Sequence, residues 1–155
     1  MFANEKIGLA MKAFRAVRMS PEAADNDPIL AERGKGEPRL LIVDPIKEKV
    51  KVLEENKIKV SALYSEMKKA SGSFYKEKLD KCVKSHLKLL TAQDQLANEV
   101  KVLSTKESKL AEDGAKAEKK LAKVRKELEE VQKELDEIKS EQADLWKLTP
   151  KRQAA

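Results

Sequence analysis

Residues 119–145, KKLAKVRKELEEVQKELDEIKSEQADL, decide the fold class of this chain. Apolar residues recur in this stretch at alternating steps of three and four, with charged residues between them. That spacing places the apolar side chains on one side of an α-helix and is typical of a coiled-coil seam. We therefore predict a helix that packs against another helix along seam residues Leu121, Val124, Leu128, Val131, Leu135, Ile138 and Leu145.

The same spacing continues toward the N-terminus as far as Leu79, over about ten heptads, more than a coiled-coil assignment usually requires. Gly114 does not shift the phase of the repeat. The pattern thus favours one continuous helix over 73–148, about 110 Å long at 1.5 Å per residue and ending before Pro150, but it leaves open whether the chain folds back at Gly72 or at Gly114.

A shorter coiled-coil helix is predicted over 45–71. Asp44 and Pro45 form a strong helix-start signal, because the aspartate can cap the helix and the proline presets φ. Between this helix and the next the repeat slips by one residue, and Gly72 has low helix propensity. The sequence predicts a hinge near Gly72.

The remaining segments give weaker signals. Residues 1–19 are predicted to form a short basic amphipathic helix, and 20–44 a linker with short helical turns and an extended run at 39–43. Residues 149–155 are expected to be a disordered tail. The predicted fold class is all-α: a long heptad-repeat helix, a preceding shorter helix, a hinge near Gly72 and a mostly irregular N-terminal segment.

Composition supports long exposed helices. Of 155 residues, 39% are charged and only 4% aromatic, and the net charge of +6 is spread over the chain with both signs interleaved. With Cys82 as the single cysteine no intrachain disulfide can form, and no apolar run is long enough to span a bilayer. We expect a cytoplasmic protein.

Catalytic and metal-binding residues are scarce. The chain lacks the glycine-rich phosphate-binding and zinc-protease motifs, and its only histidine, His86, lies four residues after Cys82 on the seam. Zinc needs four ligands, and these two residues supply half of that number. We predict no enzyme activity, no cofactor and no metal, and interpret Cys82 and His86 as a polar layer that fixes the helix register.

Function is therefore expected to reside in the seam. Leucine at one seam position and β-branched residues at the other favour antiparallel packing or larger bundles over a parallel dimer. The seam could pair between chains or pack within the chain against 46–70, and Trp146 could dock a partner or hold the helix end to a neighbour. The prediction is a structural or interaction protein that forms a homo-oligomer or binds another helical protein.

Two alternatives remain. A peripheral membrane-surface protein could use the N-terminal helix, whose membrane or partner face would comprise Ile7, Met11, Phe14, Lys12, Arg15 and Arg18. A small helical subunit of a large assembly could add its 39–43 segment to a partner. Nucleic-acid binding is disfavoured, because the basic residues near Lys120 are interrupted by seam residues and followed by acidic ones.

Overall fold

The computed structural model of the chain describes residues 4–31, 39–44, 47, 49–54, 58–112 and 117–151. They fall into two compact units, Met1–Val83 with Leu148–Ala155, and Lys84–Lys147. Helices make up most of the described chain, and one two-stranded sheet accompanies them. The predicted all-α class is confirmed.

The N-terminal helical segment is shorter than predicted. Helix α1 (Glu5–Ala10) begins at Asn4, whose side chain accepts a hydrogen bond from the Ile7 amide, and continues into a 3₁₀ turn, η1 (Met11–Ala13). Phe14 is extended, with φ −130° and ψ 151°, so the predicted helix over 1–19 stops at residue 13. The apolar side of α1 is buried, whereas the residues after Phe14 are exposed, and so short a helix needs packing to persist.

The linker contains helical turns fixed by side-chain caps. Helix α2 (Pro21–Asp25) has Ser20 at its N-cap, where the hydroxyl accepts a hydrogen bond from the Ala23 amide, and a proline at its first position. A further turn follows at Asp27, whose carboxylate accepts hydrogen bonds from the amides of Ile29 and Leu30. Residues 32–38 lie outside the described part.

A β-hairpin replaces the beginning of the predicted 45–71 helix. Strand β1 (Arg39–Asp44) pairs antiparallel with β2 (Lys49–Glu54), with Leu41 opposite Val52. The helix prediction is wrong for 49–54. Lysine and valine alternate there with a period of two, and β-branched residues favour strands, so this local pattern outweighs the helical spacing. Residues 45, 46, 48 and 55–57 lie outside the described part.

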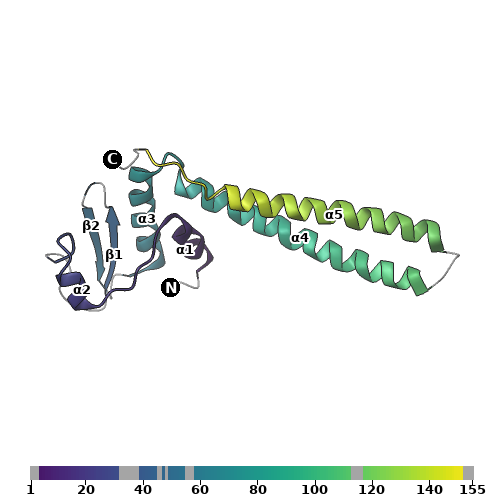
Figure 1. The fold of residues 1–155 in the computed structure, drawn as a ribbon, viewed down its shortest axis with the longest axis horizontal. Helices are drawn as coiled ribbons and strands as arrows, with labels where there is room; N and C mark the ends of the chain where they lie inside the picture. The colour runs from purple at the N-terminus through teal and green to yellow at the C-terminus, as the bar shows by residue number, and fades with distance from the viewer. Residues whose placement is uncertain are drawn as a thin grey trace. The chain divides into compact units, whose positions relative to one another are not determined.

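Helix α3 (Val60–Phe74) provides the core of this unit. Leu63 and Met67, one turn apart, are each 2% exposed, and Ile7 of α1 and Ile42 of β1 are also buried. Figure 1 shows α3 between the two strands and α1, the arrangement that buries one side of each element. Asp44 at the end of β1 accepts hydrogen bonds from the Lys47 amide and the Ser73 hydroxyl, which ties the hairpin to α3.

The break between helices lies close to Gly72, as predicted, over residues 75–78. Gly72 belongs to α3, which ends at Phe74, and α4 (Leu79–Glu112) begins after a connection over 75–78. Helix propensity alone places the break at glycine, but here the chain leaves the helix where Tyr75 becomes extended, with φ −100° and ψ 153°.

The C-terminal segment binds to this connection. The Lys76 amide donates to the Thr149 carbonyl at 2.9 Å, and the Lys151 amide donates to the Phe74 carbonyl at 2.8 Å. The Thr149 amide donates to the Glu77 carboxylate, which lowers the pKa of Glu77. Residues 149–151 are therefore held by backbone hydrogen bonds, contrary to the predicted disordered tail; residues 152–155 lie outside the described part.

Replacing Gly72 by alanine tests its role. An added Cβ at Gly72 would meet no atom within 4 Å, and the residue is helical. Alanine loses less backbone entropy in a helix, so Gly72→Ala should raise the free energy of unfolding by about 0.5–1 kcal/mol, measured by urea denaturation. A hinge that requires glycine would instead give a destabilised protein.

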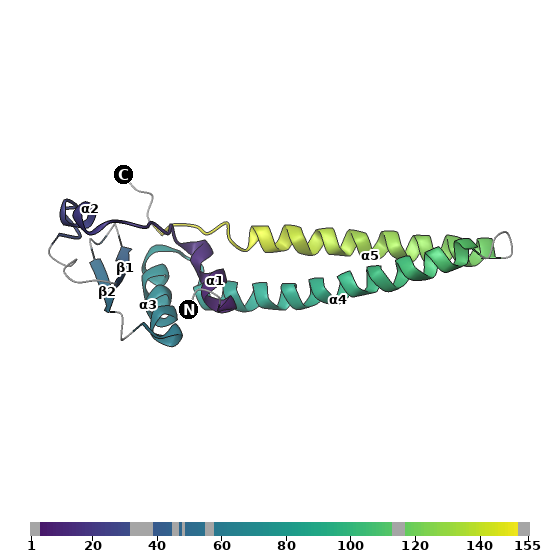
Figure 2. The ribbon, with the colours of Figure 1, turned by 90° about the horizontal axis from the view of Figure 1, so that it is seen from below.

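The second unit is an antiparallel helical hairpin of α4 and α5 (Glu118–Asp144). Gln142 Nε2 donates to Gln93 Oε1 at 2.9 Å, and Arg125 Nε pairs with Glu107 Oε1 at 2.7 Å. Figures 1 and 2 show the two helices side by side in both views. One continuous helix over 73–148 is therefore wrong: the chain reverses between Glu112 and Glu118.

The reversal is compatible with the heptad spacing on both sides of it. Each helix of an antiparallel pair needs its own apolar edge, and heptad spacing alone does not distinguish a continuing helix from a partner helix. Gly114, on which the continuous helix depended, lies outside the described part of the chain.

Candidate interaction surfaces

The predicted seam forms the inner side of the α4–α5 hairpin. The positions that follow the three-and-four spacing run from His86 to Leu145, and each of those that the structure describes is buried or half-buried. Leu103 of α4 and Val131 and Leu135 of α5 are buried. The other predicted interaction residues are half-buried: Leu121, Val124, Leu128, Ile138, Leu145 and Trp146. The seam thus pairs within the chain, against α4 rather than against 46–70.

Trp146 packs on His86 at one end of this hairpin. The indole Nε1 donates a hydrogen bond to His86 Nδ1 at 3.1 Å, and the ring centroids lie 5.8 Å apart. His86 is only 3% exposed, so its ring nitrogen needs this donor. The indole is half-buried and holds the end of α5 to α4, which was one of the two roles predicted for it.

The outer side of α5 is a solvated charged surface. Lysines pair with glutamates four residues later, as in Lys126–Glu130 at 3.8 Å, and both side chains of that pair are exposed. Such pairs contribute at most about 0.5 kcal/mol each. The basic residues near Lys120 therefore share their helix face with acidic residues, a pattern unlike a nucleic-acid interface.

The proposed membrane or partner face of the N-terminal segment is divided by the fold. Ile7 is fully buried. Met11 and Phe14 are half-buried, and exposed side chains are found at Lys12, Arg15 and Arg18. Because the helix ends at residue 13, the six residues do not share one helical side.

A recess of about 1360 Å³ lies in the first unit, beside β1. Its walls come from the extended segment after Phe14, from the turn around Ile29 and Leu30, from β1, and from one side of α3 including Phe74. Sequence patterns missed this recess, because it is formed by elements that are far apart in the chain. The apolar run over 39–43 was the one signal that pointed to it.

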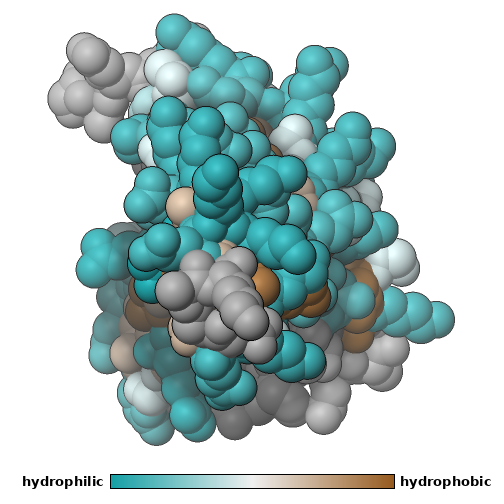
Figure 3. All heavy atoms as spheres, turned by 90° about the vertical axis from the view of Figure 1, so that its right-hand side faces the viewer, coloured by the Kyte–Doolittle hydropathy of each residue, from teal (hydrophilic) through white to brown (hydrophobic). Residues whose placement is uncertain are grey.

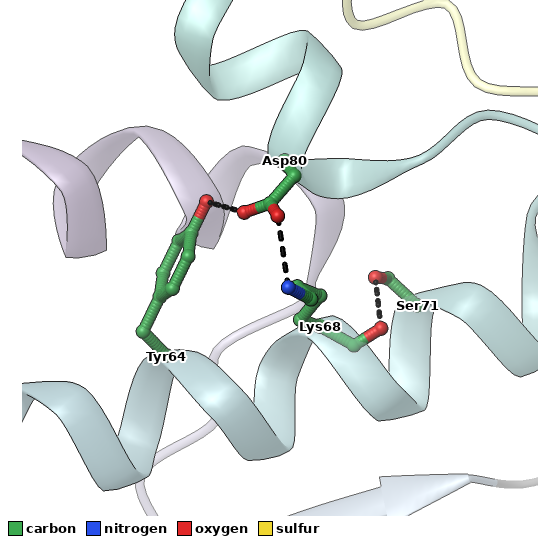
Figure 4. Close-up of polar contacts among 4 residues, drawn as sticks. All are labelled: Tyr64, Lys68, Ser71 and Asp80. Carbon is green, nitrogen blue, oxygen red and sulfur yellow. Dashed lines mark hydrogen bonds and ion pairs between the residues drawn. The ribbon is translucent and has the colours of Figure 1, made fainter.

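A polar cluster joins α3 to the first turn of α4 (Figure 4). The Tyr64 hydroxyl donates to Asp80 Oδ1 at 2.9 Å, and Lys68 Nζ pairs with Asp80 Oδ2 at 2.8 Å. Burial and the Asp80 carboxylate raise the pKa of Tyr64 to about 12. Asp80 also lies in the first turn of its helix, where a negative charge is favoured. The cluster is a structural brace that fixes where α4 begins.

The brace predicts a pH dependence of stability. The pKa of Tyr64 rises on folding from its ordinary 10.0 to about 12, so its stabilising effect is complete below pH 10 and is lost as the pH rises through 12. Tyr64→Phe should cost about 1 kcal/mol at pH 7. Urea denaturation from pH 7 to 12 should show the two proteins converging in stability above pH 10, whereas a constant difference would contradict the raised pKa.

Cys82 and His86 are both buried and lie one turn apart on α4. Burial raises the pKa of the Cys82 thiol, which keeps it protonated and unreactive at neutral pH. In the described residues, no group of three or more His, Cys, Asp or Glu side chains is placed to hold a metal ion.

No helix in the described ranges is both long enough and apolar enough to cross a membrane. Comparisons with protein-family models, with curated proteins and with solved structures gave no match.

Proposed function

We propose that this chain is an interaction protein, not an enzyme, and that it self-associates through the sides of its α4–α5 hairpin. One observation carries the proposal: most apolar seam residues of the hairpin are only half-buried, while Leu103, Val131 and Leu135 are buried. A second hairpin laid against the first would cover the rest, as in a four-helix bundle.

Burial of the seam supplies the driving force. Full burial of a leucine or valine side chain contributes roughly 1.5–3 kcal/mol, so completing the burial of several of them outweighs the surface ion pairs. The 27 residues of α5 extend over about 40 Å, which gives a long surface for a second hairpin. Leucine alternating with β-branched residues along α5 also favours bundles.

The end of the hairpin is less suited to this role. Viewed toward the end where α4 stops and α5 begins, hydrophilic side chains dominate and hydrophobic ones form small separate areas (Figure 3). The half-buried apolar residues that support association are instead spaced along the lengths of α4 and α5.

Light scattering coupled to size exclusion tests the proposal. We expect a mass of at least twice the 17.5 kDa of one chain, rising with concentration. Leu128→Asp should abolish association, whereas Lys126→Ala, which removes one exposed 3.8 Å ion pair, should leave the mass unchanged. A wild-type chain that stays monomeric at all concentrations would contradict the proposal.

A second variant separates loss of association from loss of the hairpin. Leu128→Ala keeps a strong helix former while removing most of the apolar side chain. It should weaken association and retain the helical circular dichroism signal at 222 nm.

A cytoplasmic location remains part of the proposal, and fractionation of cells that express the tagged chain tests it.

A further inference from the structure

The recess beside β1 gathers the exposed hydrophobic side chains of the first unit. Four large hydrophobic side chains are strongly exposed in the described part of the chain, and three of them line this recess: Val17 at 68%, Met19 at 47% and Val43 at 36%. Such clusters on a folded protein mark binding surfaces.

The recess follows the edge of β1 that faces away from β2. The consecutive residues from Leu40 to Asp44 all line it, although their side chains alternate between the two faces of the sheet, and no described side chain of β2 does. In the described ranges β1 pairs only with β2. Its other edge therefore presents backbone N–H and C=O groups that a further strand could bind.

The N-terminal wall of the recess is also extended. The segment from Arg15 to Met19 has no regular secondary structure, and within the described part its backbone makes no hydrogen bond. An extended peptide between this segment and β1 would have backbone partners along β1 and apolar side chains around it.

Charged side chains at the rim of the recess determine which peptide charge is favoured. Arg15 and Arg18 are exposed, and no hydrogen bond or ion pair with another described residue engages their guanidinium groups. Among the described lining residues two are acidic, and both accept hydrogen bonds: Asp27 accepts from the amides of its own turn, and Asp44 accepts from the Ser73 hydroxyl. These neutral donors leave both carboxylates charged but occupy them in half-buried positions, so the charged groups that lie open to a ligand among the described lining residues are the exposed guanidinium groups of Arg15 and Arg18.

We propose that this recess binds an extended segment of a partner protein, in which hydrophobic residues alternate with carboxylates, as an added strand along β1. The six residues of β1 extend over about 20 Å, so six or seven peptide residues would fill the edge. This site is independent of association through the hairpin.

Two other occupants fit less well. In a symmetric pair of chains joined through this recess, Arg15 and Arg18 would approach their own copies, and like charges repel. A membrane surface would contact exposed Val17 and Met19 but would not enter the recess, where Met11 and Phe14 lie half-buried.

Fluorescence anisotropy with synthetic peptides on the full chain tests the proposal. The probe is the labelled peptide Val-Glu-Val-Glu-Val-Glu-Val with blocked ends, and the reference peptide has lysine in place of glutamate. We expect the glutamate peptide to bind and the lysine peptide to bind on the order of tenfold more weakly. Methylation of alternate backbone nitrogens of the glutamate peptide should abolish binding, because it removes the donors that face β1.

Matched charge reversals locate the site. Arg15→Glu combined with Arg18→Glu should weaken the glutamate peptide on the order of tenfold and favour the lysine peptide. Lys49→Glu combined with Lys51→Glu makes the same charge change on exposed residues of β2, outside the recess, and should leave binding unchanged. Circular dichroism confirms that each variant is folded.

Three results would overturn the proposal: no binding of either peptide, equal loss in both double variants, or binding that survives backbone methylation. Co-sedimentation with phosphatidylserine vesicles tests whether the surface binds membranes instead. Vesicle binding that depends on Arg15 and Arg18, without peptide binding, would assign the surface to membranes instead.

Discussion

Replacing Leu135 by aspartate is expected to unfold the α4–α5 hairpin. Leu135 is 8% exposed on the inner side of α5, so the substitution removes a buried apolar side chain and places a charge there. The expected cost is about 3 kcal/mol or more. Circular dichroism at 222 nm should show a large loss of helix, and amide exchange should accelerate throughout 84–112 and 118–144.

An exposed neighbour provides the control. Gln132→Asp introduces the same side chain on the outer side of α5, where it should change stability by no more than about 0.5 kcal/mol. Equal effects of the two substitutions would mean that the inner side of the hairpin is not where the structure places it.

Leu63→Ala is expected to be the most damaging truncation in the first unit. Leu63 is 2% exposed, next to Met67 in the core that α3 forms with α1 and β1. Truncating a buried leucine to alanine usually lowers the free energy of unfolding by about 2–5 kcal/mol, and the loss is larger when a larger cavity remains. Chemical denaturation should show this loss, and amide exchange should accelerate in α3.

Ser65→Ala is the matched variant on the exposed side of the same helix. It should leave the free energy of unfolding within about 0.5 kcal/mol of the wild type. If Leu63→Ala were equally mild, α3 would not have the buried side described above.

Local sequence was sufficient to identify the seam. The residues at three-and-four spacing from Leu121 to Ile138 form the buried or half-buried side of α5, because amphipathic spacing is a property of a single helix. The cap at Ser20 is likewise a local feature, because a hydroxyl and a following proline suffice to start α2.

The partner of the seam could not be read from the spacing. The spacing of apolar residues in a heptad repeat is the same whether the chain continues as one helix or reverses, so the repeat gives no signal of the reversal after Glu112.

The β-hairpin was missed for a different reason. Val50 and Leu53 fit a helical edge, but the lysine–valine alternation around them fits a strand, and pairing with β1 decided the outcome.

The recess could not be predicted at all from spacing. Val17 and Met19 are separated in sequence from Val43 by α2 and the linker, and they line one recess only in the folded unit. Their exposure, which carries the proposal of an added strand, is a property of tertiary packing.

Chemical crosslinking between positions 93 and 142 tests the hairpin most directly. The side chains of Gln93 and Gln142 meet across the seam at 2.9 Å, whereas a straight helix would place these residues, 49 apart in sequence, about 74 Å from each other. Gln93→Cys and Gln142→Cys, in a Cys82→Ser background, would be joined by a short bismaleimide in a mixture of ¹⁵N-labelled and unlabelled chains. A hairpin predicts linked peptides that are wholly light or wholly heavy; mixed pairs, or no link, would contradict it.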